Sequence, residues 1–89
     1  MKRYTLLVAW AVIERINTLP KASRQRIRRR LLELEESPDT LSEFSETGAD
    51  GRKLDVFVLD NWAFFFWIDF ADRHVKVLHM KPADRVGRG

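Results

Sequence analysis

The segment 52–80 constrains the fold most, because it holds most of the aromatic residues and predicts three consecutive antiparallel strands. Residues 53–59 and 63–70 are rich in β-branched and aromatic side chains, which favour strands. Between them, residues 60–61 (Asp-Asn) are typical of a two-residue hairpin turn. Residues 74–80 alternate well enough to form a third strand. The segment therefore predicts a meander whose central strand is the most apolar part of the chain.

A short strand and a first helix are predicted near the N-terminus. Residues 3–8 fit a short strand, although no capping residue separates it from the helix that follows. From about Ala9, the apolar residues Val12, Ile16 and Leu19 recur at helical spacing, with polar residues between them. We therefore expect a first helix that ends near Leu19.

A second helix follows directly and is expected to pair with the first. Pro20 does not extend a helix comfortably, but it suits the first turn of the next one. Ile27, Leu31 and Leu34 then repeat the helical spacing, and Pro38 disfavours helical backbone at the residue before it. Two apolar stripes joined by a short turn predict a helical hairpin that packs on the sheet.

The segment 39–51 is polar and long for a connection within a small domain. Its length fits a functional or partner-ordered loop, and it fits equally a simple crossover that returns the chain to the sheet. Leu41 and Phe44 are expected to pack against the core.

Length and composition bound the class of protein. The chain has 89 residues and no cysteine, so we expect one domain over residues 1–89, without disulfides or thiolate metal sites. Glu14 and Arg15 interrupt the N-terminal apolar run early, which argues against a signal peptide. No segment approaches the ~18 apolar residues of a membrane helix. We therefore expect a soluble, cytoplasmic protein with no membrane contact.

Charge is distributed unevenly along the chain, whose net charge is +3. Six basic residues lie within residues 21–30, and the segment 33–50 is rich in Asp and Glu. A basic surface suits an acidic partner or nucleic acid. The same run also fits the ordinary solvated face of a helix, since Arg is a good helix former.

Several local motifs, taken in order, resemble the RelE/ParE toxin superfamily of bacterial toxin–antitoxin systems over nearly the whole chain. They are the Leu19-Pro20-Lys21 joint, the Ser37-Pro38 stop, Asp50-Gly51-Arg52 before the meander, Trp67-Ile68-Asp69 at the end of the central strand, and Val75-Lys76-Val77-Leu78 in the last strand. The resemblance implies an α+β fold of the order β-α-α-β-β-β. In it, a short N-terminal strand and a helical hairpin accompany a small antiparallel sheet, and the other sheet face, here called the open face, is concave.

The resemblance implies two mechanisms. RelE-like members cut messenger RNA in the ribosomal decoding site, as endoribonucleases that need no metal or other cofactor, whereas ParE-like members poison DNA gyrase. In both, a cognate antitoxin wraps the toxin. A homodimer and a toxin–antitoxin hetero-oligomer are both compatible with it.

Transfer of the family's functional residues to this sequence is incomplete. An arginine typically follows the aromatic residue that opens the central strand, but here Ala63 follows Trp62, and alanine stabilises no phosphorane. No tyrosine lies near the C-terminus. The resemblance leaves as catalytic candidates Lys53, His79, Lys81 and Arg85.

Strand alternation predicts which aromatic residues meet the helices. In the family register, Phe64, Phe66 and Ile68 point to the helices, while Ala63, Phe65, Trp67 and Asp69 line the open face. Exposed aromatic area there would mark a protein interface, unless the C-terminal tail or the loop 39–51 covers it. The candidates for binding a partner or nucleic acid are Arg24, Arg28, Arg52, Phe65 and Trp67.

The two histidines predict no metal site, because no ligand cluster surrounds them in the sequence. We expect His74 to be a solvated turn residue. His79, two residues after Val77, is expected on the same face as Val77, as a general acid or base or as a packed, hydrogen-bonded side chain.

Three hypotheses therefore remain open. The chain is a growth-inhibiting toxin held by an antitoxin and acting on the ribosome or on gyrase, or an interaction module that has lost catalysis, as Ala63 suggests. Alternatively, it is a nucleic-acid-binding domain that uses the arginines of residues 24–30.

Overall fold

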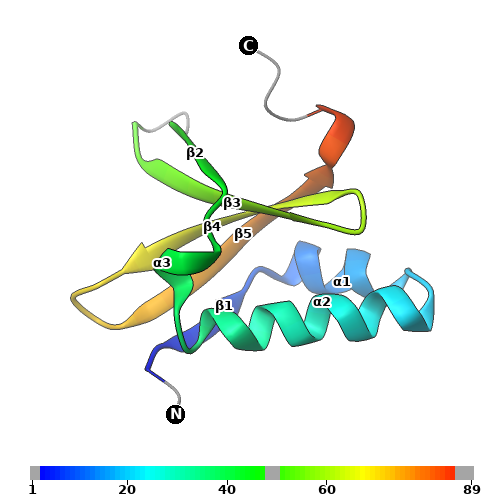
Figure 1. Cartoon of the computed structure of the whole chain (residues 1–89), viewed down its shortest axis with the longest axis horizontal. Helices are drawn as coiled ribbons and strands as arrows, with labels where there is room; N and C mark the ends of the chain where they lie inside the picture. Colours follow the sequence, from blue (N-terminus) through cyan, green and yellow to red (C-terminus); the bar gives the residue numbers. More distant parts are fainter. Residues whose placement is uncertain (1–2, 48–50, 86–89) are drawn as a thin grey trace.

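The computed structural model describes residues 3–47 and 51–85, with the backbone alone for Arg85. In chain order the elements are β1 (Thr5–Val8), α1 (Trp10–Asn17), α2 (Lys21–Leu34), α3 (Pro38–Leu41), β2 (Phe44–Thr47), β3 (Lys53–Leu59), β4 (Trp62–Asp69), β5 (His74–Pro82) and the 3-10 turn η1 (Ala83–Arg85). The strands form one five-stranded sheet in the order β1-β5-β4-β3-β2 (Figure 1). β1 runs parallel to β5, and the other neighbours are antiparallel.

The predicted meander is confirmed as β3, β4 and β5. Asp60 and Asn61 join β3 to β4 with φ values of 53° and 65°, so both lie in the left-handed region that a type I′ hairpin turn requires. Asp and Asn tolerate this region better than most residues, which is why the dipeptide marks the turn in the sequence.

The predicted helical hairpin is confirmed as α1 and α2, which lie side by side on one side of the sheet (Figure 1). Neither helix has a side-chain cap at its N-terminus, where Ala9 and Pro20 stand. The apolar stripe of α2 (Ile27, Leu31, Leu34) is buried, as expected. Among the described residues, no helix is both long and apolar enough to cross a bilayer.

The segment after Ser37 differs from the predicted loop, because it contains α3 and β2. Leu41 packs against the main core, as expected, but Phe44 is an exposed strand residue, so that expectation was wrong. All four residues of β2 are exposed, and backbone pairing with β3 holds the strand, with Phe44 opposite Val56. An edge strand of this kind leaves no apolar alternation in the sequence. Residues 48–50 of the expected loop lie outside the described part.

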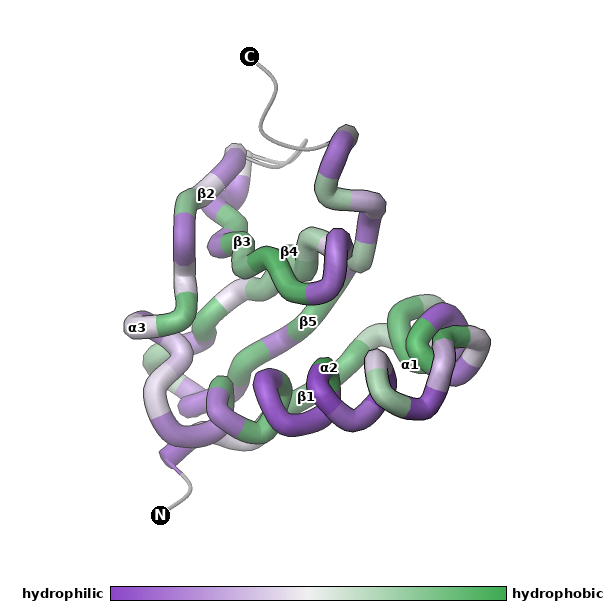
Figure 2. Tube along the Cα trace, turned by 45° about the vertical axis from the view of Figure 1, so that its right-hand side comes forward, coloured by the Kyte–Doolittle hydropathy of each residue, from purple (hydrophilic) through white to green (hydrophobic). Residues whose placement is uncertain are grey.

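The main core lies between the helices and the sheet. Phe57 stacks on Phe64 with ring centroids 4.8 Å apart and lies 5.9 Å from the ring of Phe66, and all three side chains are fully buried. Val12 of α1 and the buried stripe of α2 close this cluster from the helical side. Figure 2 shows that α2 is largely hydrophilic along its trace, whereas β4 is largely hydrophobic. The helix is thus a cover with a narrow apolar stripe.

An ion pair ties α2 to the β3–β4 turn. The Arg26 guanidinium donates from Nε to Oδ1 and Oδ2 of Asp60 at 3.0 and 2.9 Å, and its Nη2 lies 2.7 Å from Oδ2. This hydrogen bonding holds the pKa of the Asp60 carboxyl below its ordinary value. Because the pair is solvent-exposed, it orients the helix over the turn more than it stabilises the fold.

Truncation of an aromatic side chain should lower the free energy of unfolding much more at a buried position than at an exposed one. Phe66→Ala is expected to lower the free energy of unfolding by about 3–5 kcal/mol, because it removes a buried ring and leaves a cavity. Phe70→Ala, at a side chain that is 64% exposed, should change it by about 0.5 kcal/mol or less. Urea denaturation of both variants measures the difference, and equal losses would contradict the assigned core.

Candidate nucleic-acid interface

The open face carries a second, smaller apolar cluster of its own. Its buried residues are Leu54, Val56, Ala63 and Phe65. Val58, Trp67 and Leu78 pack partly buried around them. The alternation predicted for β4 is therefore confirmed, because Phe64, Phe66 and Ile68 belong to the helix-side core. A central strand that is buried on both faces has a nearly continuous run of apolar residues in its sequence.

Cationic side chains lie over the aromatic rings of this face. The Arg52 guanidinium and the Lys76 ammonium lie 4.2 Å and 4.8 Å from the centroid of the Trp67 ring. The Lys81 ammonium lies 5.2 Å from the centroid of the Phe65 ring. Such cation–π contacts are attractive, and long cationic side chains cover apolar surface with their methylene stems.

The expectation of an exposed aromatic patch was therefore wrong for Phe65, which is 3% exposed, and holds in part for Trp67, which is half-buried. Of the two predicted covers, the C-terminal tail after Arg85 and residues 48–50 of the loop lie outside the described residues. The side chains of β5 and of the segment before β3 supply a cover themselves. The open face thus carries the cations Arg52, Lys76 and Lys81 over its rings, and the carboxylates of Glu46 and Asp69 lie on the same face, Glu46 opposite Leu54.

A β-bulge in β5 decides which way His79 points. Phe65 of β4 pairs with His79, whereas the next residue, Phe66, pairs with Val77, so Leu78 is the extra residue. His79 consequently lies on the open face, where its ring meets the Phe65 ring edge-on at 6.3 Å. The predicted shared face of His79 and Val77 was wrong, because Val77 is buried on the helix side.

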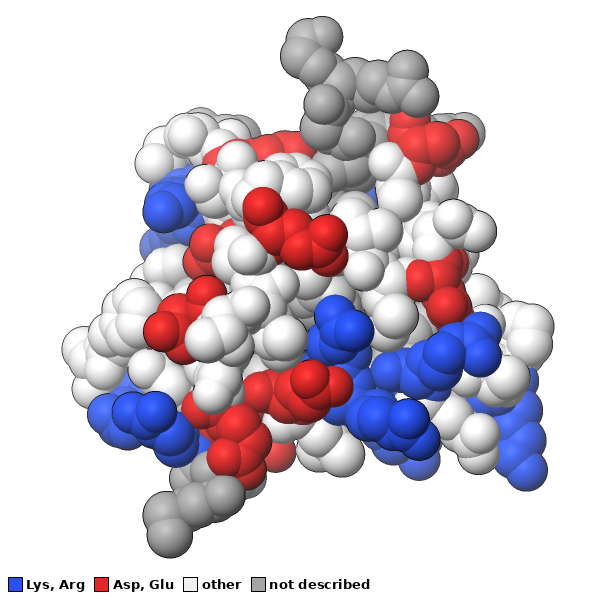
Figure 3. Space-filling view, in the orientation of Figure 1, with Lys and Arg blue, Asp and Glu red and all other residues white. Residues whose placement is uncertain are grey.

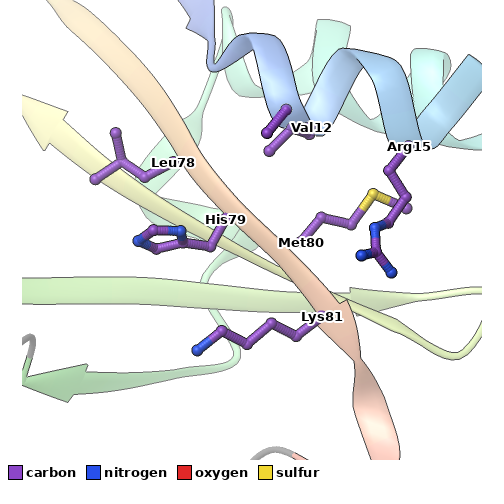
Figure 4. A pocket seen from close by; sticks show the side chains of 7 residues that line it. Val12, Arg15, Leu78, His79, Met80 and Lys81 are labelled. Atoms are coloured by element: carbon purple, nitrogen blue, oxygen red, sulfur yellow. The ribbon is translucent and has the colours of Figure 1, made fainter.

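Figure 4 shows how the bulge sorts the side chains of this strand. His79 and Lys81 extend to the same side of β5, while Met80 extends toward Val12 and Arg15 of α1. Both His79 and Lys81 are exposed. The structure thus brings two of the catalytic candidates together on one surface.

Lys53, a third catalytic candidate, does not join them. It precedes Leu54 on β3, and Leu54 belongs to the open face, so Lys53 has the opposite parity. It lines a cleft of about 600 Å³ together with Asp39, Ser42 and Asp55, and this cleft is also bordered by Trp67 and Ile68 of β4. Arg52, by contrast, reaches the open face through the ring of Trp67.

The remaining candidates lie elsewhere. Arg85 ends η1, and its side chain is outside the described part. Arg24 and Arg28 lie on α2 beside a groove of about 140 Å³ whose walls include Ile13, Ile16 and Leu31. On the face shown in Figure 3, Lys and Arg gather at the lower right, where Figure 1 places α1 and α2. The chain therefore carries two separate basic surfaces.

Comparison with solved structures gives consistent likenesses over nearly the whole chain. The RelE–RelB complex of the archaeon Pyrococcus horikoshii OT3 matches with a TM-score of 0.78 and 22% identity, covering 98% of this chain and 99% of that chain. The toxin–antitoxin complex RelBE2 of Mycobacterium tuberculosis matches with a TM-score of 0.73 and 12% identity, covering 90% and 98%.

The chain has the RelE fold. The isolated RelE toxin of E. coli also matches, with a TM-score of 0.70 and 17% identity over 94% of this chain and 88% of that chain. No protein-family model matches the sequence, and neither does any curated protein. The predicted fold class is thereby confirmed.

Within the RelE fold, the alanine at the expected arginine position is fully buried. Ala63 pairs with Lys81 across the β4–β5 ladder. The Lys81 side chain starts opposite that position and carries its ammonium over the adjacent Phe65 ring. A cation therefore reaches this part of the open face from β5, where β4 supplies none.

A cluster that the sequence did not indicate lies at the β4–β5 turn. Asp69, Asp72 and His74 place ligand atoms within 4.8 Å of one another. His74 is half-buried rather than solvated, and the Asp72 N–H donates to Asp69 Oδ1 at 3.1 Å. Sequence reasoning missed this group because it assessed each histidine for a conventional ligand spacing.

The burial of Phe65 beneath the cationic layer can be tested directly. Phe65→Ala should lower the free energy of unfolding by about 3 kcal/mol, because the ring is buried although no helix covers it. Phe44→Ala, on the neighbouring edge strand, should lower it by about 1 kcal/mol or less. Chemical denaturation compares the two, and a neutral Phe65→Ala would mean that the open face is loosely covered.

Proposed function

We propose that this chain is the toxin of a type II toxin–antitoxin pair, that its open face binds RNA, and that it inhibits growth by cutting ribosome-bound messenger RNA. The observation that carries the proposal is the layer of cations on that face, with an exposed His79 beside Lys81. Phosphate groups are attracted to such a surface without regard to base sequence. The RelE fold, seen in chains that are complexed with RelB, supports the same role.

His79 and Lys81 would divide the chemistry between them. The 2′-hydroxyl of the RNA attacks the neighbouring phosphate, the P–O5′ bond breaks, and a cyclic phosphate and a free 5′-hydroxyl result. An imidazole exchanges protons near neutral pH, so His79 would take the 2′-hydroxyl proton or protonate the leaving 5′-oxygen. Lys81 would stabilise the charge that develops on the phosphate. It would thereby take the role of the family arginine, whose expected position is occupied here by Ala63.

The antitoxin would use the second basic surface. The groove between α1 and α2 has an apolar lining and two arginines at its side, Arg24 and Arg28. An acidic amphipathic segment would bury its apolar side chains in the groove and place its carboxylates near these arginines. Antitoxin binding there would leave the open face uncovered. RNA and a further part of the same antitoxin would then compete for that face.

The buried Ala63 favours a second candidate function, an interaction module without catalysis. In that case the chain would bind a partner, or poison DNA gyrase, and would leave messenger RNA intact. Because Ala63 is fully buried, Ala63→Arg must first be shown to fold by circular dichroism. The folded variant would then be inert, whereas a gain of RNA cleavage would show that the scaffold remains competent.

Induced expression should distinguish these functions. The chain alone is expected to arrest bacterial growth, co-expression of the neighbouring reading frame should relieve the arrest, and mapped 5′ ends should show new cuts in messenger RNA. His79→Ala and Lys81→Gln should each lower the cleavage rate about 10²–10⁴-fold, the usual contribution of an acid–base group. Arg29→Gln, an exposed residue of α2, is the matched control and should cut normally.

The alternative outcomes are distinct. Arrest with DNA-damage signalling and trapped cleaved DNA, but without cut messenger RNA, would support gyrase poisoning. Normal growth at good soluble expression would overturn the toxin proposal itself.

A further inference from the structure

We propose that Asp69, Asp72 and His74, at the turn between β4 and β5, bind one divalent transition-metal ion, such as Mn²⁺ or Zn²⁺. The two carboxylates and the imidazole place their ligand atoms within 4.8 Å of one another. The site is independent of the proposed RNA cleavage, because it lies at a part of the chain that this chemistry does not use.

Strand pairing places two of the three ligands opposite each other. Asp69 ends β4 and His74 begins β5, and the two residues are partners across the antiparallel ladder. Their neighbours Ile68 and Val75 are buried in the helix-side core, so strand alternation puts Asp69 and His74 on the open face. Asp72 joins them from the turn, where its N–H donates to Asp69 Oδ1 at 3.1 Å.

The spacing of the ligand atoms suits a shared ion better than direct contact between the side chains. Within the described part of the chain, the His74 imidazole takes part in no hydrogen bond or ion pair, although both carboxylates lie close to it. Two bonds of about 2.1 Å from one ion span at most about 4.2 Å. Small rotations of these side chains would therefore close the three ligand atoms around an ion. A cation there also relieves the repulsion between the two carboxylates.

Contacts with β1 hold the turn in this shape. Thr5, the partner of His74 in β1, donates its N–H to the Arg73 carbonyl oxygen at 2.9 Å. The Arg73 guanidinium donates to the Arg3 carbonyl oxygen at 3.2 Å and lies 5.3 Å from the centroid of the Tyr4 ring. The cation next to the ligands in the sequence is thus directed to the N-terminal segment. A turn fixed in advance binds a ligand with little ordering cost.

The donor set selects the class of ion. One imidazole with two carboxylates is a mixed nitrogen and oxygen set, which suits Mn²⁺, Co²⁺ or Zn²⁺, whereas Ca²⁺ and Mg²⁺ prefer oxygen ligands alone. Two carboxylates also balance the charge of a divalent ion. Among the described residues, Lys76 makes no ion pair with either carboxylate, and its ammonium lies 4.8 Å from the centroid of the Trp67 ring.

The ion would clamp the end of β4 to the start of β5. His74 and His79 are separated by five positions in the sequence, which is about 16 Å along a strand. The ion would therefore not reach the groups proposed to act on RNA. Because only the folded chain brings the three ligands together, the ion would raise the midpoint of thermal unfolding.

Titration with Mn²⁺ tests the site. The full chain is purified without a polyhistidine tag, freed of metal with a chelator and titrated with manganese chloride, while electron paramagnetic resonance measures the free ion. We expect one Mn²⁺ per chain. His74→Gln and Asp72→Asn should each weaken binding by at least about tenfold, since the loss of a supporting residue alone costs that much. His79→Gln and Glu46→Gln remove an imidazole and a carboxylate elsewhere on the same face, so both controls should bind as the parent does.

A second readout locates the ion. Mn²⁺ broadens the NMR signals of nearby nuclei, so the amide signals of residues 69–74 and of Thr5 should broaden first, and that of His79 should stay sharp. Zn²⁺ binds such donor sets more tightly than Mn²⁺ and is diamagnetic, so its addition should restore the broadened signals.

Three results would overturn the site. The first is that the folded parent chain binds neither Mn²⁺ nor Zn²⁺ at millimolar concentration. The second is an unchanged affinity in His74→Gln, which would reduce the cluster to ordinary surface charge. The third is broadening centred away from residues 69–74. Each of these results would leave the proposed RNA cleavage untouched, because the cleavage assay uses different residues.

Discussion

The two-residue period of β4 is the constraint on which the rest of the structure depends. It sends Phe64, Phe66 and Ile68 beneath the helical hairpin and Ala63, Phe65 and Trp67 to the opposite face. A strand that is apolar on both sides needs two covers. The helices supply one, and the cationic side chains of Arg52, Lys76 and Lys81 supply the other. Because the second cover consists of cationic side chains, the residues that bury the rings are also the ones that place positive charge on this face.

The β-bulge at Leu78 connects this architecture to the proposed chemistry. Without the extra residue, strict alternation would put His79 on the side of Val77, inside the core. With it, His79 comes to the edge of the Phe65 ring, and Met80 returns to the helix-side core. Bulges re-aim side chains in this way at functional sites in many proteins. Here the inserted residue brings His79 and Lys81 to the open face of β5.

Much of the fold could be predicted from the sequence, because its signals are local. The Asp60-Asn61 turn, the joint at Pro20 and the alternation of β4 each follow from backbone preferences and spacing. The structure adds what those signals do not contain. β2 is held by its backbone pairing with β3, and Lys53 points to the helix side because Leu54, not Lys53, shares the open face. The cover over Phe65 and the tie between Arg26 and Asp60 join residues far apart in the sequence, so no spacing reveals them.

The central claim is that the open face, rather than the arginine-bearing helix α2, receives RNA. Titration of the isotope-labelled chain with a non-cleavable oligonucleotide, followed by NMR, tests this most directly. We expect shifts in the side-chain signals of the Trp67 indole, His79 and Lys81, and unchanged signals from Arg28 and Arg29. Shifts confined to α2, with the Trp67 indole unmoved, would contradict the account.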